Sequence, residues 1–241
     1  MTRCLIIIGA GAHILKRYTP SSYYDEIFFS VSSQKSKTIS FSSRSTPFHY
    51  DLFDTSFDFE EFSQLLKPHS RIDILYAAYS GLGLKQSDSV SEIQSSVTAN
   101  CIQPILFFSR VSALFTSIDI SGIFISSMYA HVAPYPPNYQ LDSEINPLFY
   151  GVSKAGVEQG LRWLSVQRPN HCFNSIALGP MPNPRVVNQS PHLITALVQQ
   201  LPSGHFVNHQ ELHSLIDHIF ANSPGSLRGS TLSLDGGYTL W

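Results

Sequence analysis

Short apolar runs alternate with amphipathic stretches along most of the 241-residue chain. The run Cys4–Ile8 is continuous and rich in isoleucine, which is typical of a strand buried on both faces of a sheet. Six further runs predict strands at Glu26–Val31, His49–Leu52, Ile72–Ala77, Gly122–Ser126, Cys172–Leu178 and Leu232–Leu234. Because strands alternate with helices, the pattern predicts an α/β fold, with a doubly wound, mostly parallel sheet of six to seven strands and helices on both faces.

Amphipathic stretches predict four helices, at Phe57–Leu66, Ser89–Phe115, Tyr150–Val166 and Asn208–Asn222. The second of these is long and mostly apolar, and Pro104 inside it predicts a kink or an interruption of the helical hydrogen bonding. The fourth begins with Asn208 and Glu211 at the spacing of a capping box, which satisfies the first backbone N–H groups of a helix.

Two glycines follow the first predicted strand, in the segment Gly9-Ala10-Gly11-Ala12-His13-Ile14. Glycines here let the backbone approach a pyrophosphate and direct its N–H groups at the phosphates, with a helix opening directly after the turn. The full dinucleotide-binding pattern has three glycines, so an ordinary tight turn is the alternative. The cofactor-binding candidates are Gly9, Gly11, His13 and Ile14, and His13 is either a donor to a phosphate or an exposed helix residue.

The second predicted strand ends without the acidic residue that binds the ribose hydroxyls of NAD. The loop that follows begins Ser32-Ser33-Gln34-Lys35, and its hydroxyl and ammonium groups suit a 2′-phosphate. Ser33 and Lys35 are therefore cofactor-binding candidates that favour NADP(H) over NAD(H). A solvated loop is the alternative.

Composition narrows the class of protein. Charged residues make up 13% of the chain and apolar residues 43%, which supports a packed core and argues against disorder. The net charge of −2 argues against a nucleic-acid-binding protein, which would carry a basic face.

Cys4, Cys101 and Cys172 lie far apart without metal-ligand spacing, so we expect no metal site and a reducing, cytoplasmic environment. With no apolar run of ~18 residues and no signal-peptide pattern, we expect a soluble protein without a membrane partner.

Tyr150 and Lys154 lie four residues apart in a predicted helix, so both side chains project from one face. A nearby ammonium favours the phenolate and lowers the pKa of the tyrosine, which can then exchange a proton with a substrate hydroxyl or carbonyl oxygen. Such a pair also occurs by chance, so its surroundings matter. Ser127 follows a predicted strand and can hydrogen-bond the same oxygen. Asn100 is a polar residue in a largely apolar helix, where it requires partners.

These residues give the sequence a resemblance to the short-chain dehydrogenase/reductase family, whose domain is Rossmann-like, and the resemblance covers nearly the whole chain. Asn100, Ser127, Tyr150 and Lys154 match the Asn-Ser-Tyr-Lys tetrad of that family. The segments that match its cofactor-binding parts are the glycine turn, Asp51-Leu52 for the adenine, Ala77-Ala78 at the end of the fourth strand, and Gly179-Pro180-Met181 beside the nicotinamide. The ending Leu234-Asp235-Gly236-Gly237 is typical of the short members.

The resemblance implies a role for each member of the tetrad. Tyr150 is the general acid/base and also contacts the cofactor, and Ser127 polarises the substrate oxygen. Lys154 binds the nicotinamide ribose and lowers the pKa of the tyrosine, and Asn100 holds a water molecule in a proton relay.

The resemblance also implies one domain over residues 1–241, with a cofactor half at about 1–110, a catalytic half at 120–241 and a substrate lid at 181–207. Members of the family commonly pair through two long helices. The corresponding stretches here, near 89–115 and 150–166, imply a homodimer or homotetramer.

The chain departs from the short members between the serine and the tyrosine, where residues 129–148 form an insert. We expect the insert to form a loop over the substrate, with Tyr129 as a substrate-binding candidate, and surface decoration is the alternative. Its Glu144-Ile145-Asn146-Pro147 is similar to a pattern of sugar-nucleotide epimerases and dehydratases. In the expected lid, Arg185 is a candidate for contact with an anionic substrate, and a solvated arginine is the alternative.

Three functions follow from the pattern. The first is an NAD(P)-dependent oxidoreductase that interconverts a carbonyl and a secondary hydroxyl of a small molecule, such as a sugar nucleotide or a secondary-metabolite precursor. The second is a sugar-nucleotide epimerase or dehydratase that holds its cofactor tightly. The third is a non-catalytic nucleotide-binding relative, which the depleted glycine turn suggests. The complete tetrad favours an enzyme.

Overall fold

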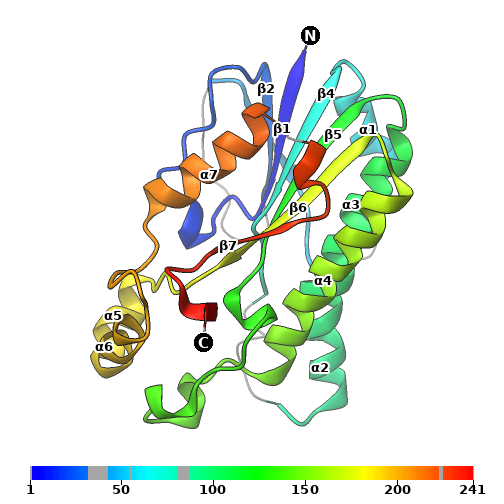
Figure 1. The fold of residues 1–241 in the computed structure, drawn as a ribbon. Helices are drawn as coiled ribbons and strands as arrows, with labels where there is room; N and C mark the ends of the chain where they lie inside the picture. The colour runs from blue at the N-terminus through cyan, green and yellow to red at the C-terminus, as the bar shows by residue number, and fades with distance from the viewer. Residues whose placement is uncertain (1, 32–42, 55, 81–86, 223–224, 241) are drawn as a thin grey trace.

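The computed structural model describes residues 2–31, 43–54, 56–80, 87–222 and 225–240. Its seven strands form one sheet in the order β3-β2-β1-β4-β5-β6-β7, and every neighbouring pair is parallel (Figure 1). The strands are β1 (Arg3–Ile8), β2 (Glu26–Val31), β3 (Ser45–His49), β4 (Arg71–Tyr76), β5 (Asp119–Ile125), β6 (His171–Leu178) and β7 (Thr231–Leu234). The predicted doubly wound parallel sheet is confirmed. The strand order reverses between β1 and β4, which is where ligands bind in such sheets.

Helices α1 (Phe59–Leu66), α3 (Gln103–Leu114) and α4 (Leu148–Gln167) cover one face of the sheet (Figure 1). Apolar side chains from these helices and from the central strands form one continuous buried core. The helix α1 begins two residues later than predicted because Asp58 caps it, accepting a 2.9 Å hydrogen bond from the backbone N–H of Glu61.

Helix α7 (His209–Asn222) lies on the other face, and its predicted capping box is present. The side chain of Asn208 accepts from the N–H of Glu211, and the carboxylate of Glu211 accepts from the N–H of Asn208. Leu15, Tyr18 and Tyr24 pack into the core beneath this helix.

The prediction that a helix follows the glycine turn is wrong. The chain forms only the 3-10 turn η1 (His13–Leu15) before it continues to β2. Leu15 stands at one of the positions after Gly11 where a further glycine could be expected, and its side chain is buried in the core. The Leu15 side chain shares the buried core of this face with apolar side chains of α7.

The long apolar stretch forms three helical parts: α2 (Val90–Val97), the π-helical turn η4 (Thr98–Ile102) and α3. Pro104 has no N–H group to donate to the carbonyl of Asn100, four residues earlier. The helical turn therefore contains one residue more than an α-helical turn, and the N–H of Gln103 donates to the carbonyl of Thr98, five residues earlier. The predicted interruption is confirmed.

The third strand differs from its prediction at His49–Leu52. It runs from Ser45 to His49 and includes Pro47, which the sheet tolerates because β3 is an edge strand. Asp51 and Leu52 lie in the loop that follows.

The expected lid contains two helices, α5 (Pro184–Gln189) and α6 (Pro191–Gln199). The insert contains three short 3-10 turns, η5 (Met128–Ala130), η6 (Pro136–Asn138) and η7 (Asp142–Glu144). Cys4, Cys101 and Cys172 form no disulfide bond; Cys4 and Cys172 are buried and Cys101 is half-buried. No helix in the described ranges is both long and apolar enough to cross a membrane.

Candidate active site

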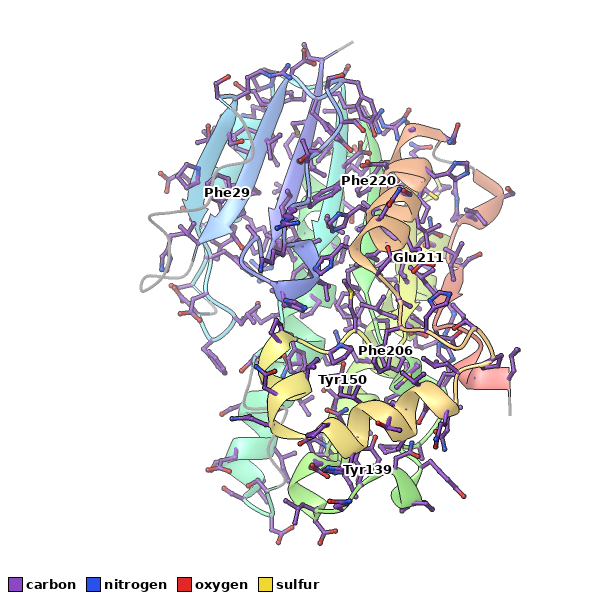
Figure 2. The ribbon with its side chains drawn as sticks, turned by 90° about the vertical axis from the view of Figure 1, so that its left-hand side faces the viewer. Phe29, Tyr139, Tyr150, Phe206, Glu211 and Phe220 are labelled. Carbon is purple, nitrogen blue, oxygen red and sulfur yellow. The ribbon has the colours of Figure 1, made fainter. Side chains whose placement is uncertain are left out.

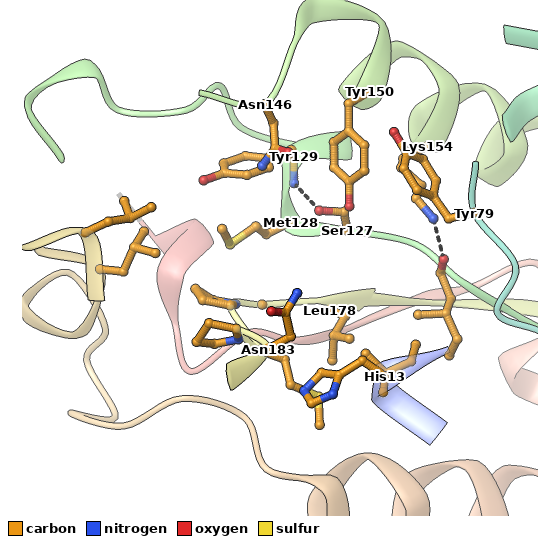
Figure 3. A pocket seen from close by; sticks show the side chains of 18 of the residues that line it. His13, Tyr79, Ser127, Met128, Tyr129, Asn146, Tyr150, Lys154, Leu178 and Asn183 are labelled. Atoms are coloured by element: carbon orange, nitrogen blue, oxygen red, sulfur yellow. Dashed lines mark hydrogen bonds between the residues drawn. The ribbon is translucent and has the colours of Figure 1, made fainter. Parts of the chain in front are cut away.

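A cavity of about 600 Å³ lies at the carboxyl ends of the central strands (Figure 3). The turn after β1 and the ends of β4, β5 and β6 line one part of it, and the insert, α4 and the lid helices line the other. This is the edge of the sheet at which the sequence pattern predicts ligand binding.

Three of the four predicted catalytic residues line this cavity: Ser127, Tyr150 and Lys154. Ser127 follows β5, and the other two lie one turn apart on α4. The hydroxyl groups of Ser127 and Tyr150 point toward one another (Figure 3). The backbone N–H of Tyr129 donates a 3.2 Å hydrogen bond to Ser127 Oγ, which holds the serine at the end of the strand.

Burial raises the pKa of Tyr150, and a hydrogen bond from Ser127 partly offsets this rise. The expected lowering of this pKa by Lys154 is therefore not observed. Lys154 Nζ lies 5.9 Å from the centre of the Tyr150 ring. In this structure the partner that stabilises the phenolate is the serine hydroxyl.

Lys154 is buried, and its Nζ donates a 2.8 Å hydrogen bond to the carbonyl oxygen of Ile125. Burial lowers the pKa of Lys154 to about 7, against the opposing effect of the Glu158 carboxylate one turn further along α4. The ammonium also lies 4.6 Å from the ring centre of Phe124 and 5.2 Å from that of Tyr79. The charge of this lysine is thus poised to change near neutral pH.

Tyr79 lines the cavity, and sequence reasoning missed it. Its ring centre lies 5.1 Å from that of Tyr150, in an edge-to-face arrangement. The Tyr79 hydroxyl is buried without a hydrogen-bond partner among the described residues. The only signal in the sequence was its place directly after Ala77-Ala78, because an aromatic residue next to a buried strand otherwise indicates core packing.

Asn100 lies in the π-helical turn and is not among the residues that line the cavity. Its Oδ1 accepts a 2.7 Å hydrogen bond from the backbone N–H of Ser80, and its Nδ2 lies 3.4 Å from Ser96 Oγ. The expectation that a polar residue in this apolar helix has partners is confirmed. Its role in a proton relay stays a prediction.

Besides Tyr150 and Lys154, six further predicted cofactor-binding residues line the cavity: His13, Ile14, Ala77, Gly179, Pro180 and Met181. Gly9 does not line the cavity, and its φ of +86° favours glycine. A Cβ atom at Gly9 would lie 2.4 Å from the backbone nitrogen of Ala78, so a glycine is needed where this turn meets the end of β4. This close approach fits the backbone cradle that a nicotinamide dinucleotide requires.

The remaining cofactor candidates lie elsewhere. Gly11, Asp51, Leu52 and Ala78 do not line the cavity. The carboxylate of Asp51 accepts a 2.9 Å hydrogen bond from the N–H of Phe53 within its own loop. The predicted 2′-phosphate contacts, Ser33 and Lys35, fall outside the described residues.

The insert and the lid close over the cavity and are joined to each other. Figure 2 views the molecule from the side of α5 and α6, with Tyr139 and Tyr150 beside them. Glu144 of the insert accepts hydrogen bonds of 2.7 Å from Ser190 Oγ and 3.0 Å from His192 Nε2 of the lid. The predicted substrate contact Tyr129 also lines the cavity. Arg185 lies in α5, but its side chain falls outside the described part of the structure.

Neither a protein-family model nor a curated protein matches the sequence. The structure is similar to a short chain dehydrogenase from Leptospira borgpetersenii with bound NAD+, with a TM-score of 0.80 and 18% identity over 99% of this chain and 93% of that one. The NADPH-dependent 3-quinuclidinone reductase from Rhodotorula rubra has a TM-score of 0.80 and 18% identity, over 99% and 92% of the two chains. The NADP complex of RhlG from Pseudomonas aeruginosa has a TM-score of 0.74 and 17% identity, over 98% and 96%. Together with its sheet order and its crossover helices, these likenesses show that the chain has the fold of the short-chain dehydrogenases/reductases.

Proposed function

We propose that this protein is an NAD(P)-dependent oxidoreductase that interconverts a carbonyl and a secondary hydroxyl, with Tyr150 as the general acid/base. The observation that carries the proposal is the convergence of the Tyr150 and Ser127 hydroxyl groups in one cavity, with the buried Lys154 beside them. The fold supports it, because similar structures contain NAD+ or NADP.

The bound cofactor supplies or accepts the hydride. In the reducing direction, the Tyr150 hydroxyl gives its proton to the substrate oxygen, and in the oxidising direction the phenolate takes a proton back. The Ser127 hydroxyl donates to the same oxygen and steadies the charge that develops there. Lys154 would bind the nicotinamide ribose, and the Ser127 hydroxyl is the partner that favours the phenolate of Tyr150.

The cofactor candidates that line the cavity would hold the nicotinamide end: His13, Ile14, Ala77, Gly179, Pro180 and Met181. Gly9 and Gly11 would bring the backbone to the pyrophosphate. The preference for NADP(H) over NAD(H) rests on Ser33 and Lys35 and stays a sequence-based proposal, as do the adenine contacts of Asp51 and Leu52 and the water-holding role of Asn100.

The epimerase or dehydratase alternative rests on the segment Glu144–Pro147. In the structure the Glu144 side chain has a structural role. Its carboxylate joins the insert to the lid through Ser190 and His192. The non-catalytic alternative rests on the depleted glycine turn. A pure nucleotide-binding protein has no use for a serine and a tyrosine hydroxyl aimed at each other in the cavity, so the oxidoreductase is the function we favour.

We also propose a homodimer or homotetramer of cytoplasmic location, paired through the helices near 89–115 and 150–166. Apolar side chains on these helices are exposed in the single chain, which supports pairing. They are Ile102, Leu106, Val152, Trp163 and Val166.

Titration of the purified protein with NADH and NADPH, followed by cofactor fluorescence, tests the cofactor claim. We expect saturable binding of at least one of the two, tighter for NADPH, and a higher melting temperature in its presence, because a ligand of the folded state stabilises it. The absence of binding for both cofactors would instead support the non-catalytic relative.

A further inference from the structure

The cavity has two ends of different electrostatic character. At the end formed by the sheet, the basic side chains among the described lining residues are those of His13 and Lys154. At the end formed by the insert and the lid, Glu144 is the only described lining side chain that carries a formal charge. The basic side chains therefore lie where an anionic cofactor would bind, and the carboxylate lies where the substrate would bind.

From this arrangement we infer that the substrate is an uncharged, largely apolar carbonyl compound or alcohol, with an aromatic or alicyclic ring beside the reacting carbon. The inference rests on the proposed function and goes further by assigning the chemistry of the substrate. It disfavours sugar nucleotides and other phosphate-bearing molecules, which the sequence left open.

Glu144 excludes anions through its charge and its hydrogen bonds. Besides Ser190 and His192, the backbone N–H groups of Gln140 and Leu141 donate to its carboxylate, at 3.0 and 3.3 Å. Against the opposing effect of desolvation, these hydrogen bonds lower the pKa of Glu144 to about 2, so the carboxylate is ionised throughout the range in which an enzyme is assayed. An anionic substrate would meet this negative charge in the wall of the cavity.

The rest of this wall suits an apolar ring. Met128, Leu193 and Leu197 are buried together with Tyr129 in a small separate core between the insert and α6. The hydroxyl groups of Tyr129 and Tyr139 lie 2.6 Å apart and bond to each other. Because these two phenols satisfy one another, an apolar substrate can contact their rings without leaving a buried hydroxyl unpaired.

A sugar nucleotide would need the opposite arrangement. Proteins hold a diphosphate with arginine or lysine side chains, or with backbone N–H groups that have no other acceptor. No arginine or lysine side chain that the structure describes lines the end formed by the insert and the lid, and the side chain of Arg185 in α5 lies outside the described part. The neutral side chains of Asn146 and Asn183 line the same region and suit a neutral oxygen on the substrate.

A matched pair of ketones tests the inference: 4′-methylacetophenone and 4-acetylbenzoate, which differ mainly by a carboxylate. The readout is kcat/KM for reduction with the cofactor that binds more tightly. We expect the neutral ketone to be favoured at least tenfold in the wild-type protein. Glu144→Gln should narrow the ratio several-fold, whereas Asp142→Asn, on an exposed side chain of the same 3-10 turn, should leave it unchanged.

The outcomes separate the two proposals. A preference for 4-acetylbenzoate, or faster turnover of UDP-glucose than of either ketone, overturns the substrate inference while leaving an oxidoreductase in place. The melting temperature shows whether the Glu144→Gln variant is folded. If the folded variant has the same ratio of kcat/KM for the two ketones as the wild-type protein, Glu144 does not exclude anions, and this result also counts against the inference. If neither cofactor binds to the wild-type protein, the proposed function itself fails. The ratio in the wild-type protein tests the inference even if the Glu144 variant does not fold.

Discussion

Lys154 Nζ donates a 2.8 Å hydrogen bond to the carbonyl oxygen of Ile125, at the end of β5. This bond ties the predicted catalytic helix α4 to the strand that leads into Ser127, two residues further on. Since the lysine is buried, its pKa falls to about 7 from an ordinary value of 10.5. The charge next to Tyr150 therefore depends on pH around neutrality.

The first prediction concerns the effect of Lys154 on stability. Between pH 7 and about 10 the folded state binds fewer protons than the unfolded state, so the free energy of unfolding rises with pH over this interval. Below pH 7 the cost of burying the charge is fully present. Lys154→Met removes that cost, so we expect it to raise the melting temperature more at pH 6 than at pH 9.

Thermal unfolding at the two pH values measures this difference, with Lys67→Met on an exposed lysine as the control. Each unit between the folded and unfolded pKa corresponds to about 1.4 kcal/mol. A stabilisation that is equal at both pH values would show that Lys154 has an ordinary pKa.

The second prediction concerns Tyr79, whose ring covers Lys154. Tyr79→Ala should admit water to the lysine and raise the pKa of Lys154 by about one unit, because desolvation is the main cause of its low value. Tyr79→Phe should leave the pKa in place, since the Tyr79 hydroxyl has no partner in the described structure. The midpoint of the basic limb in the pH profile of kcat/KM measures the change in the pKa of Lys154. Equal midpoints in the two variants would exclude a shielding role for the ring.

The third prediction concerns a buried ion network at the other end of the sheet. The carboxylate of Asp73 is buried between Arg3 and Arg71, at 2.5 and 3.3 Å, and it accepts a 3.0 Å hydrogen bond from the Tyr24 hydroxyl. Asp73→Asn leaves two guanidinium groups without their counter-charge, so we expect a loss of about 3–5 kcal/mol in the free energy of unfolding.

Urea denaturation measures this loss, and Asp119→Asn on an exposed carboxylate of β5 serves as the control. A loss below about 1 kcal/mol for Asp73→Asn would mean that the network contributes no more than a surface ion pair does.

The fourth prediction concerns Gly9. Its φ of +86° and the 2.4 Å that would separate an added Cβ from the Ala78 nitrogen mean that Gly9→Ala must displace the turn or the end of β4. We expect a loss of at least about 2 kcal/mol in stability and weaker cofactor binding. Gly225→Ala is the matched control, because no atom lies within 4 Å of the added Cβ. Equal stability of the two variants would contradict the account of the turn.

Much of the sheet could be predicted from the sequence, because strands buried on both faces are continuous apolar runs such as Cys4–Ile8. The third strand was misplaced because Pro47 made Ser45–His49 look unlike a strand, and only its position at the sheet edge permits that proline. The missing helix after Gly9 could not be foreseen, since it depends on where the Leu15 side chain packs.

For the candidate site, Ser127, Tyr150 and Lys154 could be predicted because their types and spacing reflect chemistry. The raised pKa of Tyr150 could not, since it depends on burial and on the distance to Lys154 rather than on their separation in the sequence. Tyr79 was missed for a similar reason, because its residue type indicates only core packing.

The measurement that tests the central claim most directly compares wild-type protein, Tyr150→Phe and the control Tyr135→Phe, whose side chain is exposed. Each is assayed for cofactor binding by fluorescence and for reduction of 4′-methylacetophenone and a panel of further ketones and aldehydes. Tyr150→Phe removes the proton donor and keeps the ring, so we predict a loss of at least about 100-fold in kcat with cofactor affinity and melting temperature preserved. Near-normal turnover in Tyr150→Phe, with Tyr135→Phe also active, would contradict the assignment of Tyr150 as the general acid/base.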